Sequence, residues 1–359
     1  MSERVKVGIA GLGRAGMCMH LPELKKFRGC YEIVAGCDIA PSRLEAFHRE
    51  EPQAACCSDY DSLLRDRRVD LVAVAVFSAD HVLFAEKALA AGKRVFLEKP
   101  FALTAAGAAR LREMCRRYPD RIFFRLNRRF ESGFRFIRRV MASGVLGETD
   151  RIVLRRHSYV FRDDWQTLSA CGGGQLNNWG PHLIDQALIL LESPVRSVWS
   201  RMRRVAALGD AEDNVHFIFT GENRRIAEVE ISGSTAVPGN TCEIHGSRGS
   251  LVSADGENFF LRRVSDGFEP PERRASPLPP SPDTPFYAPE NIPQWHEEKF
   301  NALKEIGEDI DACYGHLHPA LVGAGEYPVS SDEALRVVEM TLAIREQGGA
   351  EFPLAASDH

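Results

Sequence analysis

The stretch ACGGGQLNNWGPHLIDQAL, residues 170–188, holds side chains whose types and spacing suit proton transfer. His182 is a candidate base, because an imidazole can take the proton of a hydroxyl group near neutral pH. Asn178 could orient that ring or bind a substrate hydroxyl, and Asp185 lies one helical turn beyond His182, within its reach. Trp179 is either a stacking platform for a sugar or plain packing. The structural alternatives are a packed histidine and asparagines that form a turn before a helix.

A glycine loop near the start of the chain has the spacing of a dinucleotide-binding turn. Gly11, Gly13 and Gly16 directly follow the apolar strand 4–10 and open a helix, and Asp38 ends the next strand. The first glycine permits a tight turn, the second lets the backbone approach a pyrophosphate, and the third lets the helix pack closely on the strand. The amide groups at the helix start would bind the phosphates.

The residue at the end of the second strand bears on the choice of cofactor. Asp38 can accept hydrogen bonds from the ribose hydroxyls of NAD and would repel the 2′-phosphate of NADP. Ile39 suits contact with adenine, whereas Arg43 could accommodate a phosphate. We therefore expect NAD, with NADP less favoured. The other cofactor contacts expected from the loop are Arg14, Ala15 and Met17.

A second landmark, VFLEKPF at residues 95–101, follows an apolar strand. It places Glu98 and Lys99 at the carboxyl end of that strand, the edge at which open parallel sheets bind ligands. A lysine there could be a surface charge, but the adjacent acid and the proline that fixes the turn favour a functional role.

The elements that must position these residues fall into two groups. Five apolar strands alternate with helices, one of which has Ser42 as a candidate N-cap, and predict a doubly wound parallel sheet. These strands are 4–10, 31–38, 69–77, 93–100 and 121–127. Short alternating segments with turn signals then predict a mostly antiparallel sheet. They are TDRIVLRRHSYV, VRSVWSRMRRV, DNVHFIFT, RRIAEVEIS, NTCEIHG and GSLVSAD.

The fold class is therefore α/β, with two domains. Residues 1–126 form an N-terminal Rossmann domain, and residues 127–330 form an α+β domain for substrate binding and oligomerisation. The segment WHEEKFNALKEIGEDIDACY predicts a helix. A C-terminal helix at about 331–348 is expected to pack back on the first domain. The Pro-rich segment 269–290 predicts a long exposed loop.

These motifs, in this order, resemble the Gfo/Idh/MocA oxidoreductase family, which includes glucose–fructose oxidoreductase and inositol dehydrogenase. The matching pieces are GIAGLGRAGMCMH, AGKRVFLEKPFALT, RLNRRFESGF, ASGVLGE, GGGQLNNWGPHLIDQAL, EIHGSRGSL and EYPVSSDEALRVVEMTLAI. The resemblance implies that Lys99 lies near the nicotinamide and the reacting carbon. It also implies that Glu98, Ser78, His81 and Asn127 line the cofactor pocket, and that the open face of the second sheet serves oligomerisation.

Two positions depart from the family pattern. Phe77 stands where the family often has proline, and it could press on the cofactor ring or fill core. Asn178 stands where many members have an aspartate four residues before the histidine, so an imidazolium at His182 would be less stabilised.

Three weaker candidates for a functional role also have structural explanations. Trp165, in RDDWQTL, could belong to a substrate-side loop or to a surface turn, and His157 could reach the pocket or pair across strands. The segment CYGHLH at 313–318 has ligand-type residues without the spacing of a zinc site, so we expect no metal.

Composition narrows the class of protein. The chain has 359 residues and a net charge of -5, which argues against a nucleic-acid partner. Its nine cysteines include no C-x-x-C pair and fit free thiols in a reducing cytoplasm. No apolar run approaches the ~20 residues of a membrane helix, and the start lacks the apolar region of a secretory signal.

Together these features predict an NAD(P)-dependent dehydrogenase that acts on a secondary alcohol of a sugar, polyol or derivative. We expect it to be a cytoplasmic homo-oligomer, a dimer or tetramer, that associates through the second sheet. His182 would act as base and acid, Lys99 would polarise the oxygen, and Asn178 and Asp185 would orient. The alternatives are an NAD-assisted glycosidase or lyase that oxidises its substrate transiently, and a dinucleotide-binding sensor of weak activity.

Overall fold

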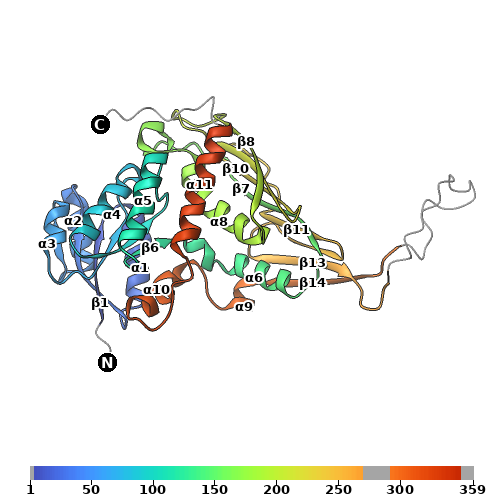
Figure 1. Cartoon of the computed structure of the whole chain (residues 1–359), viewed down its shortest axis with the longest axis horizontal. Helices are drawn as coiled ribbons and strands as arrows, with labels where there is room; N and C mark the ends of the chain where they lie inside the picture. The colour runs from blue at the N-terminus through green and yellow to red at the C-terminus, as the bar shows by residue number, and fades with distance from the viewer. Residues whose placement is uncertain (1–3, 270–291, 349–359) are drawn as a thin grey trace, which may run out of the picture.

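The computed structural model describes residues 4–269 and 292–348, and it contains two sheets side by side (Figure 1). The first sheet has six parallel strands in the order β3-β2-β1-β4-β5-β6, which confirms the predicted doubly wound sheet. Five of its strands were predicted; the sixth, β3, has three residues, too few for a periodic pattern. The strands are β1 (Val5–Ala10), β2 (Tyr31–Cys37), β3 (Ala55–Cys57), β4 (Leu71–Val74), β5 (Arg94–Glu98) and β6 (Ile122–Arg125).

Helices connect these parallel strands, as a parallel sheet requires. They are α1 (Leu21–Lys26), α2 (Pro41–Glu50), α3 (Tyr60–Arg65), α4 (His81–Ala90) and α5 (Ala105–Arg117). The prediction of Ser42 as the N-cap of α2 is wrong. Ala40 occupies that position and Pro41 is the first helical residue, because the fixed φ of proline suits a helix start.

The second sheet has eight strands in the order β14-β13-β12-β11-β7-β10-β9-β8. Only β7 and β10 pair in parallel, so the prediction of a mostly antiparallel sheet is confirmed. In β9, buried and half-buried residues alternate, which places Phe217 and Phe219 on the face toward the helices. The strands are β7 (Thr149–His157), β8 (Val195–Arg203), β9 (Asn214–Gly221), β10 (Ile226–Ser232), β11 (Cys242–Gly246), β12 (Gly249–Ser253), β13 (Asn258–Val264) and β14 (Trp295–Asn301).

The prediction of a helix from Trp295 onward is wrong for its first seven residues. Trp295–Asn301 forms the edge strand β14, which pairs antiparallel with β13 over its whole length. The glutamates and lysine of this segment favour a helix locally, but pairing with β13 overrides that weak preference. Helix begins only after Asn301, whose side chain caps α9 (Ala302–Ile306), and α10 (Cys313–Leu321) follows.

Three further helices lie between the sheets or against the second one. They are α6 (Ser132–Ala142), α8 (Gly180–Leu191) and α11 (Ser331–Gly348). Helix α11, red in Figure 1, contacts α5 and β6 on one side and α8 and β8 on the other, so it joins the two parts of the molecule. The predicted division after residue 126 falls between β6 and the helical turn Asn127–Phe130, and it stays a prediction.

Two further predictions concern the Pro-rich segment and the absence of a membrane-spanning helix. Most of the Pro-rich segment, residues 270–290, lies outside the described residues. Within residues 4–269 and 292–348, no helix is long and apolar enough to cross a bilayer.

Candidate active site

A cavity of about 750 Å³ is lined both by the glycine loop after β1 and by the triple-glycine loop Gly172–Gly174 before α8. It brings together most of the residues predicted from the sequence. Those that line it are Gly11, Gly13, Arg14, Ala15, Asp38, Ile39, Arg43, Phe77, Ser78, His81, Glu98, Lys99, Asn127, Trp165, Asn178, Trp179 and His182. Gly16, Met17, His157 and Asp185 are not among the lining residues.

The glycine loop leaves space where a pyrophosphate would approach. Gly11 has φ +93°, and a Cβ there would lie 2.4 Å from the carbonyl oxygen of Ala75. At Gly13, by contrast, an added Cβ would meet only Arg43, at 3.8 Å, so this backbone faces open space. Asp38 pins the loop by accepting a hydrogen bond of 2.9 Å from the Leu12 amide. This loop fits a dinucleotide phosphate, and the pyrophosphate would come closest to the backbone at Gly13.

Replacing Gly13 with alanine should weaken NAD binding by about tenfold or more, which is about 1.4 kcal/mol. The new methyl group would occupy the approach to the phosphate without touching the folded chain. Calorimetric titration with NAD and the melting temperature of the apoprotein test this expectation. Gly29→Ala is the matched control, because Gly29 is exposed with open space around it. Equal NAD affinity in both variants would contradict the expectation that the pyrophosphate lies against the Gly13 backbone.

Lys99 projects from the end of β5 to the loop that precedes α8. Its Nζ donates a hydrogen bond of 2.7 Å to the Asn178 carbonyl oxygen and lies 3.4 Å from Asn178 Oδ1. Burial lowers the pKa of Lys99 to about 8; Glu98 opposes this shift, and Arg128 adds to it. The amine can therefore both donate a hydrogen bond and exchange a proton near neutral pH.

His182 lies in the first turns of α8, and its side chain is buried. Its Nδ1 is buried and has no hydrogen-bond partner among the described residues. Burial holds the pKa of His182 well below its usual range, and the positive charges of Lys99 and Arg128 lower it further. The ring is therefore neutral and can accept a proton.

Asp185 has a different partner from the one expected. Its carboxylate forms two contacts with the Arg129 guanidinium, one of them 3.0 Å from Nε to Oδ2. Arg129 also donates to Glu333 at 2.9 Å, at the start of α11. A buried carboxylate requires an opposite charge more than a neutral ring, so Asp185 ties α8 to α11 and does not orient His182.

The two asparagines have separate tasks. Asn177 is buried, and its Nδ2 donates to the carbonyl oxygens of Gly172 and Gly173 at 2.9 and 3.2 Å. Its Oδ1 accepts a hydrogen bond of 2.6 Å from Arg345 on α11. Asn177 therefore holds the glycine loop, while Asn178 faces Lys99 and the cavity.

Glu212, which the sequence analysis missed, also holds this loop. Its Oε1 accepts the Leu176 amide at 2.9 Å, and its backbone oxygen accepts the Gln175 amide at 3.0 Å. Gly174 has φ +101°, and a Cβ there would lie 2.3 Å from the Glu212 carboxylate. Burial raises the pKa of Glu212 to about 7.

This raised pKa makes stability depend on pH. Between pH 4.5 and about 7 the folded state holds a proton at Glu212 that the unfolded state releases. Protonation of Glu212 therefore contributes fully to the free energy of unfolding below pH 4.5. This contribution, about 3 kcal/mol, is lost as pH rises through about 7. Glu212→Gln should remove this part of the decline in unfolding free energy, as measured by denaturant titration at pH 5 and pH 8. Identical pH dependence in both proteins would refute it.

The aromatic candidates surround the cavity in different ways. Phe77 and Trp165 form an edge-to-face pair with ring centroids 5.3 Å apart. The Trp179 ring has two guanidinium groups over it, Arg128 at 4.3 Å and Arg156 at 4.1 Å from its centroid. These cations occupy the ring surface that a sugar would need.

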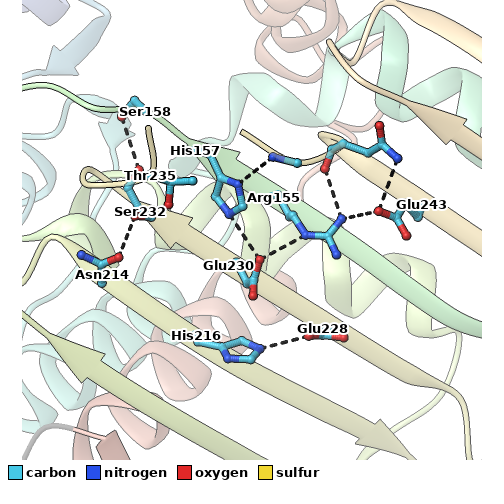
Figure 2. A network of polar contacts seen from close by, with 12 residues as sticks. Arg155, His157, Ser158, Asn214, His216, Glu228, Glu230, Ser232, Thr235 and Glu243 are labelled. Atoms are coloured by element: carbon cyan, nitrogen blue, oxygen red, sulfur yellow. Dashed lines mark hydrogen bonds and ion pairs between the residues drawn. The ribbon is translucent and has the colours of Figure 1, made fainter. Parts of the chain in front are cut away.

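His157 lies on the outer face of the second sheet, outside the cavity (Figure 2). Its Nε2 is 3.2 Å from Glu230, and its Nδ1 accepts the Gly239 amide at 3.2 Å. His157 therefore pairs across strands, with Glu230 on β10, as the second of its two predicted roles describes. Nearby, His216, Glu228 and Glu230 bring ligand-type atoms within 4.8 Å, but Arg151 and Arg155 already pair with the two carboxylates.

The ligand-type residues of 313–318 point to separate neighbours. Cys313 is fully buried, His316 stacks on Phe130 with centroids 4.7 Å apart, and His318 packs on Tyr31 at 5.6 Å.

A buried polar cluster beneath Lys99 was also missed. Arg125 donates to Glu98 at 2.8 Å and to Glu23 at 2.7 Å, and His20 Nε2 lies 3.2 Å from Glu98. Tyr314, on α10, bonds His20 at 2.7 Å and donates its amide to Glu23 at 2.6 Å. Burial would raise the pKa of Glu98, but the Arg125 charge holds it well below its usual range. The only local signal is the histidine of GMCMH, because the partners lie far apart in the chain.

Both parts of the chain match known family models. Residues 5–125 match an oxidoreductase family with an NAD-binding Rossmann fold, and residues 134–252 match the GFO/IDH/MocA C-terminal domain. The chain is 26% identical over 349 residues to the uncharacterized oxidoreductase YdgJ of Escherichia coli, covering 95% of each. It is 25% identical over 350 residues to the scyllo-inositol 2-dehydrogenase (NADP(+)) IolW of Bacillus subtilis, covering 96% of this chain and 94% of that protein.

Solved structures share the fold over almost the whole chain. An NAD-binding protein from Listeria innocua superposes with a TM-score of 0.80 at 23% identity, covering 97% of this chain and 98% of that one. The WlbA dehydrogenase from Bordetella pertussis, solved in complex with NADH and UDP-GlcNAcA, gives a TM-score of 0.76 at 18% identity and covers 99% of both chains.

Proposed function

Since the chain belongs to the Gfo/Idh/MocA oxidoreductase family and has its NAD-binding Rossmann fold, we propose that it oxidises a secondary alcohol of a sugar, polyol or derivative. The observation that carries the proposal is that Lys99, Asn178 and His182 line the same cavity as the glycine loop, with Lys99 Nζ 2.7 Å from the Asn178 carbonyl oxygen. The inositol dehydrogenase among its relatives supports a polyol-like substrate.

The residues divide the work of such an oxidation. Bound NAD would supply the acceptor for the hydride that leaves the substrate carbon. Lys99 would donate a hydrogen bond to the substrate oxygen and stabilise the charge that develops as its proton leaves. His182, neutral and with no partner at Nδ1 among the described residues, would take that proton. Glu98 and Asn127 line the same cavity and would position the nicotinamide end.

The test is an absorbance assay for reduced nicotinamide. The purified protein would be incubated with NAD, and separately with NADP, against neutral sugars, inositols and sugar acids. Reduction of NAD with one polyol or sugar would support the proposal. A flat trace across the panel would overturn it. Bound NAD with cleavage of a glycosidic bond would then favour the NAD-assisted lyase, and bound NAD without bond chemistry would favour the sensor.

Assembly and location also remain proposals. The outer face of the eight-stranded sheet presents charged pairs between β7, β9 and β10 (Figure 2), and we expect two or four copies to associate through it. Light scattering of the purified protein would measure the number of copies. All nine cysteines are free thiols, which supports a reducing cytoplasm.

A further inference from the structure

The substrate end of the cavity gathers cations. Arg128 and Arg162 line it together with Lys99. Arg156 does not line the cavity; its guanidinium lies 4.1 Å from the centroid of the lining residue Trp179, whose ring Arg128 also covers. Stacking on a shared ring fixes the positions of these two guanidinium groups before any ligand arrives.

The carboxylates on the cavity lining are fewer than these cations. Arg162 pairs with Asp164, and Arg128 pairs with Glu131, which does not line the cavity. Glu98 lines the cavity, and its Oε1 also contacts Arg125 and His20. Among the lining residues here, the three cations Lys99, Arg128 and Arg162 stand against the two carboxylates Glu98 and Asp164, which leaves an excess of one positive charge.

The same excess acts on the two proposed catalytic groups. Burial is the largest cause of the lowered pKa values of Lys99 and His182; Arg128 lowers both further, while Glu98 opposes both shifts. A low pKa handicaps His182 as a base, because its protonated form is disfavoured. A negative charge brought by the substrate would raise both pKa values and favour proton transfer.

Asn178 fits this arrangement in a way that an acid would not. Its Oδ1 lies 3.4 Å from Lys99 Nζ, so an aspartate there would neutralise the lysine and repel an anion. The uncharged amide leaves that negative charge to be supplied by the ligand. This gives a physical reason for asparagine at a position where related motifs carry aspartate.

From these contacts we propose that the substrate is an anionic sugar or polyol derivative, whose carboxylate or phosphate is held by Arg128 and Arg162 beside Lys99. Guanidinium groups bind such planar or tetrahedral oxyanions with paired hydrogen bonds. The inference rests on the proposed function, because it names the substrate class of the same site.

The experiment uses matched sets of neutral and charged compounds with the full chain and saturating NAD. Each set contains a neutral sugar or inositol, its carboxylate counterpart and its phosphate counterpart, for example glucose, glucuronate and glucose 6-phosphate. NAD reduction gives kcat/KM, and thermal denaturation gives binding independently of turnover. We expect at least one charged member to exceed its neutral counterpart about 30-fold in kcat/KM. Which charged member leads distinguishes carboxylate from phosphate.

Two variants test the residues. Arg162→Gln should reduce the preference for the charged compound about tenfold, while Arg116→Gln, at an exposed pair with Glu113, should leave it unchanged. Asn178→Asp should lower kcat/KM for the charged compound at least tenfold and lower that for the neutral compound much less.

The outcomes separate this inference from the proposed function. Oxidation of neutral compounds at rates equal to or above those of their charged counterparts overturns the inference and leaves the function standing. Thermal stabilisation by charged compounds that depends on Arg162, without NAD reduction, supports anion recognition and overturns the oxidation. Absence of both effects across all sets overturns both.

Discussion

Replacing Lys99 with methionine should lower kcat/KM by about 10³-fold and leave NAD affinity nearly unchanged. Methionine keeps the length of the side chain but cannot donate a hydrogen bond or exchange a proton. The amine contacts Asn178 at the substrate end, away from the glycine loop that would bind the pyrophosphate. Steady-state kinetics and NAD titration on the same preparation separate the two effects.

Lys87→Met is the matched control, because Lys87 is exposed on α4 and its ion pair with Asp61, at 3.4 Å, lies on the surface. It should retain the activity of the unaltered protein. Turnover within tenfold of that value in Lys99→Met would remove Lys99 from the chemistry. A parallel loss of NAD affinity would instead indicate a role in cofactor binding.

The second large effect concerns stability and comes from Arg125. This residue is almost fully buried between Glu23 and Glu98, and Arg125→Met would leave two carboxylates buried without their cation. We expect the free energy of unfolding to fall by about 3–5 kcal/mol. Chemical denaturation at neutral pH measures the loss.

An exposed pair provides the comparison. Arg116→Met removes a salt bridge with Glu113 on the surface of α5 and should cost less than about 1 kcal/mol. Adding Glu23→Gln to Arg125→Met should recover part of the stability, because one of the two unpaired charges is removed. A loss at Arg125 no larger than that at Arg116 would show that the buried cluster does not stabilise the fold.

The part of the site that could be predicted from the sequence is local in the chain. The glycine loop, the Glu98–Lys99 pair and the Asn178–His182 spacing are each carried by a few neighbouring residues. A strand and the helix after it place such residues in a fixed relation, so their meeting in one cavity was predictable.

The rest depends on partners that are distant in the chain. The cluster of His20, Glu23, Glu98, Arg125 and Tyr314 joins residues separated by up to 294 positions, and no local pattern reveals it. The spacing of residues in the sequence also does not show which of two possible partners a side chain will contact. Helical spacing placed Asp185 near His182, but a buried guanidinium at Arg129 attracts the carboxylate more strongly. The edge strand β14 was missed for the same reason, since only β13 makes it a strand.

The two side chains that we propose to act on the substrate come from different parts of the molecule: Lys99 follows β5 of the six-stranded sheet, and His182 lies on α8 beside the eight-stranded sheet. Helix α11 touches both parts, and its Arg345 bonds both Leu103 and Asn177. The alignment of amine and imidazole is therefore a property of how the two halves dock. If the proposed mechanism holds, we expect a compound that separates the two halves at α11 to lower turnover without resembling either NAD or the substrate.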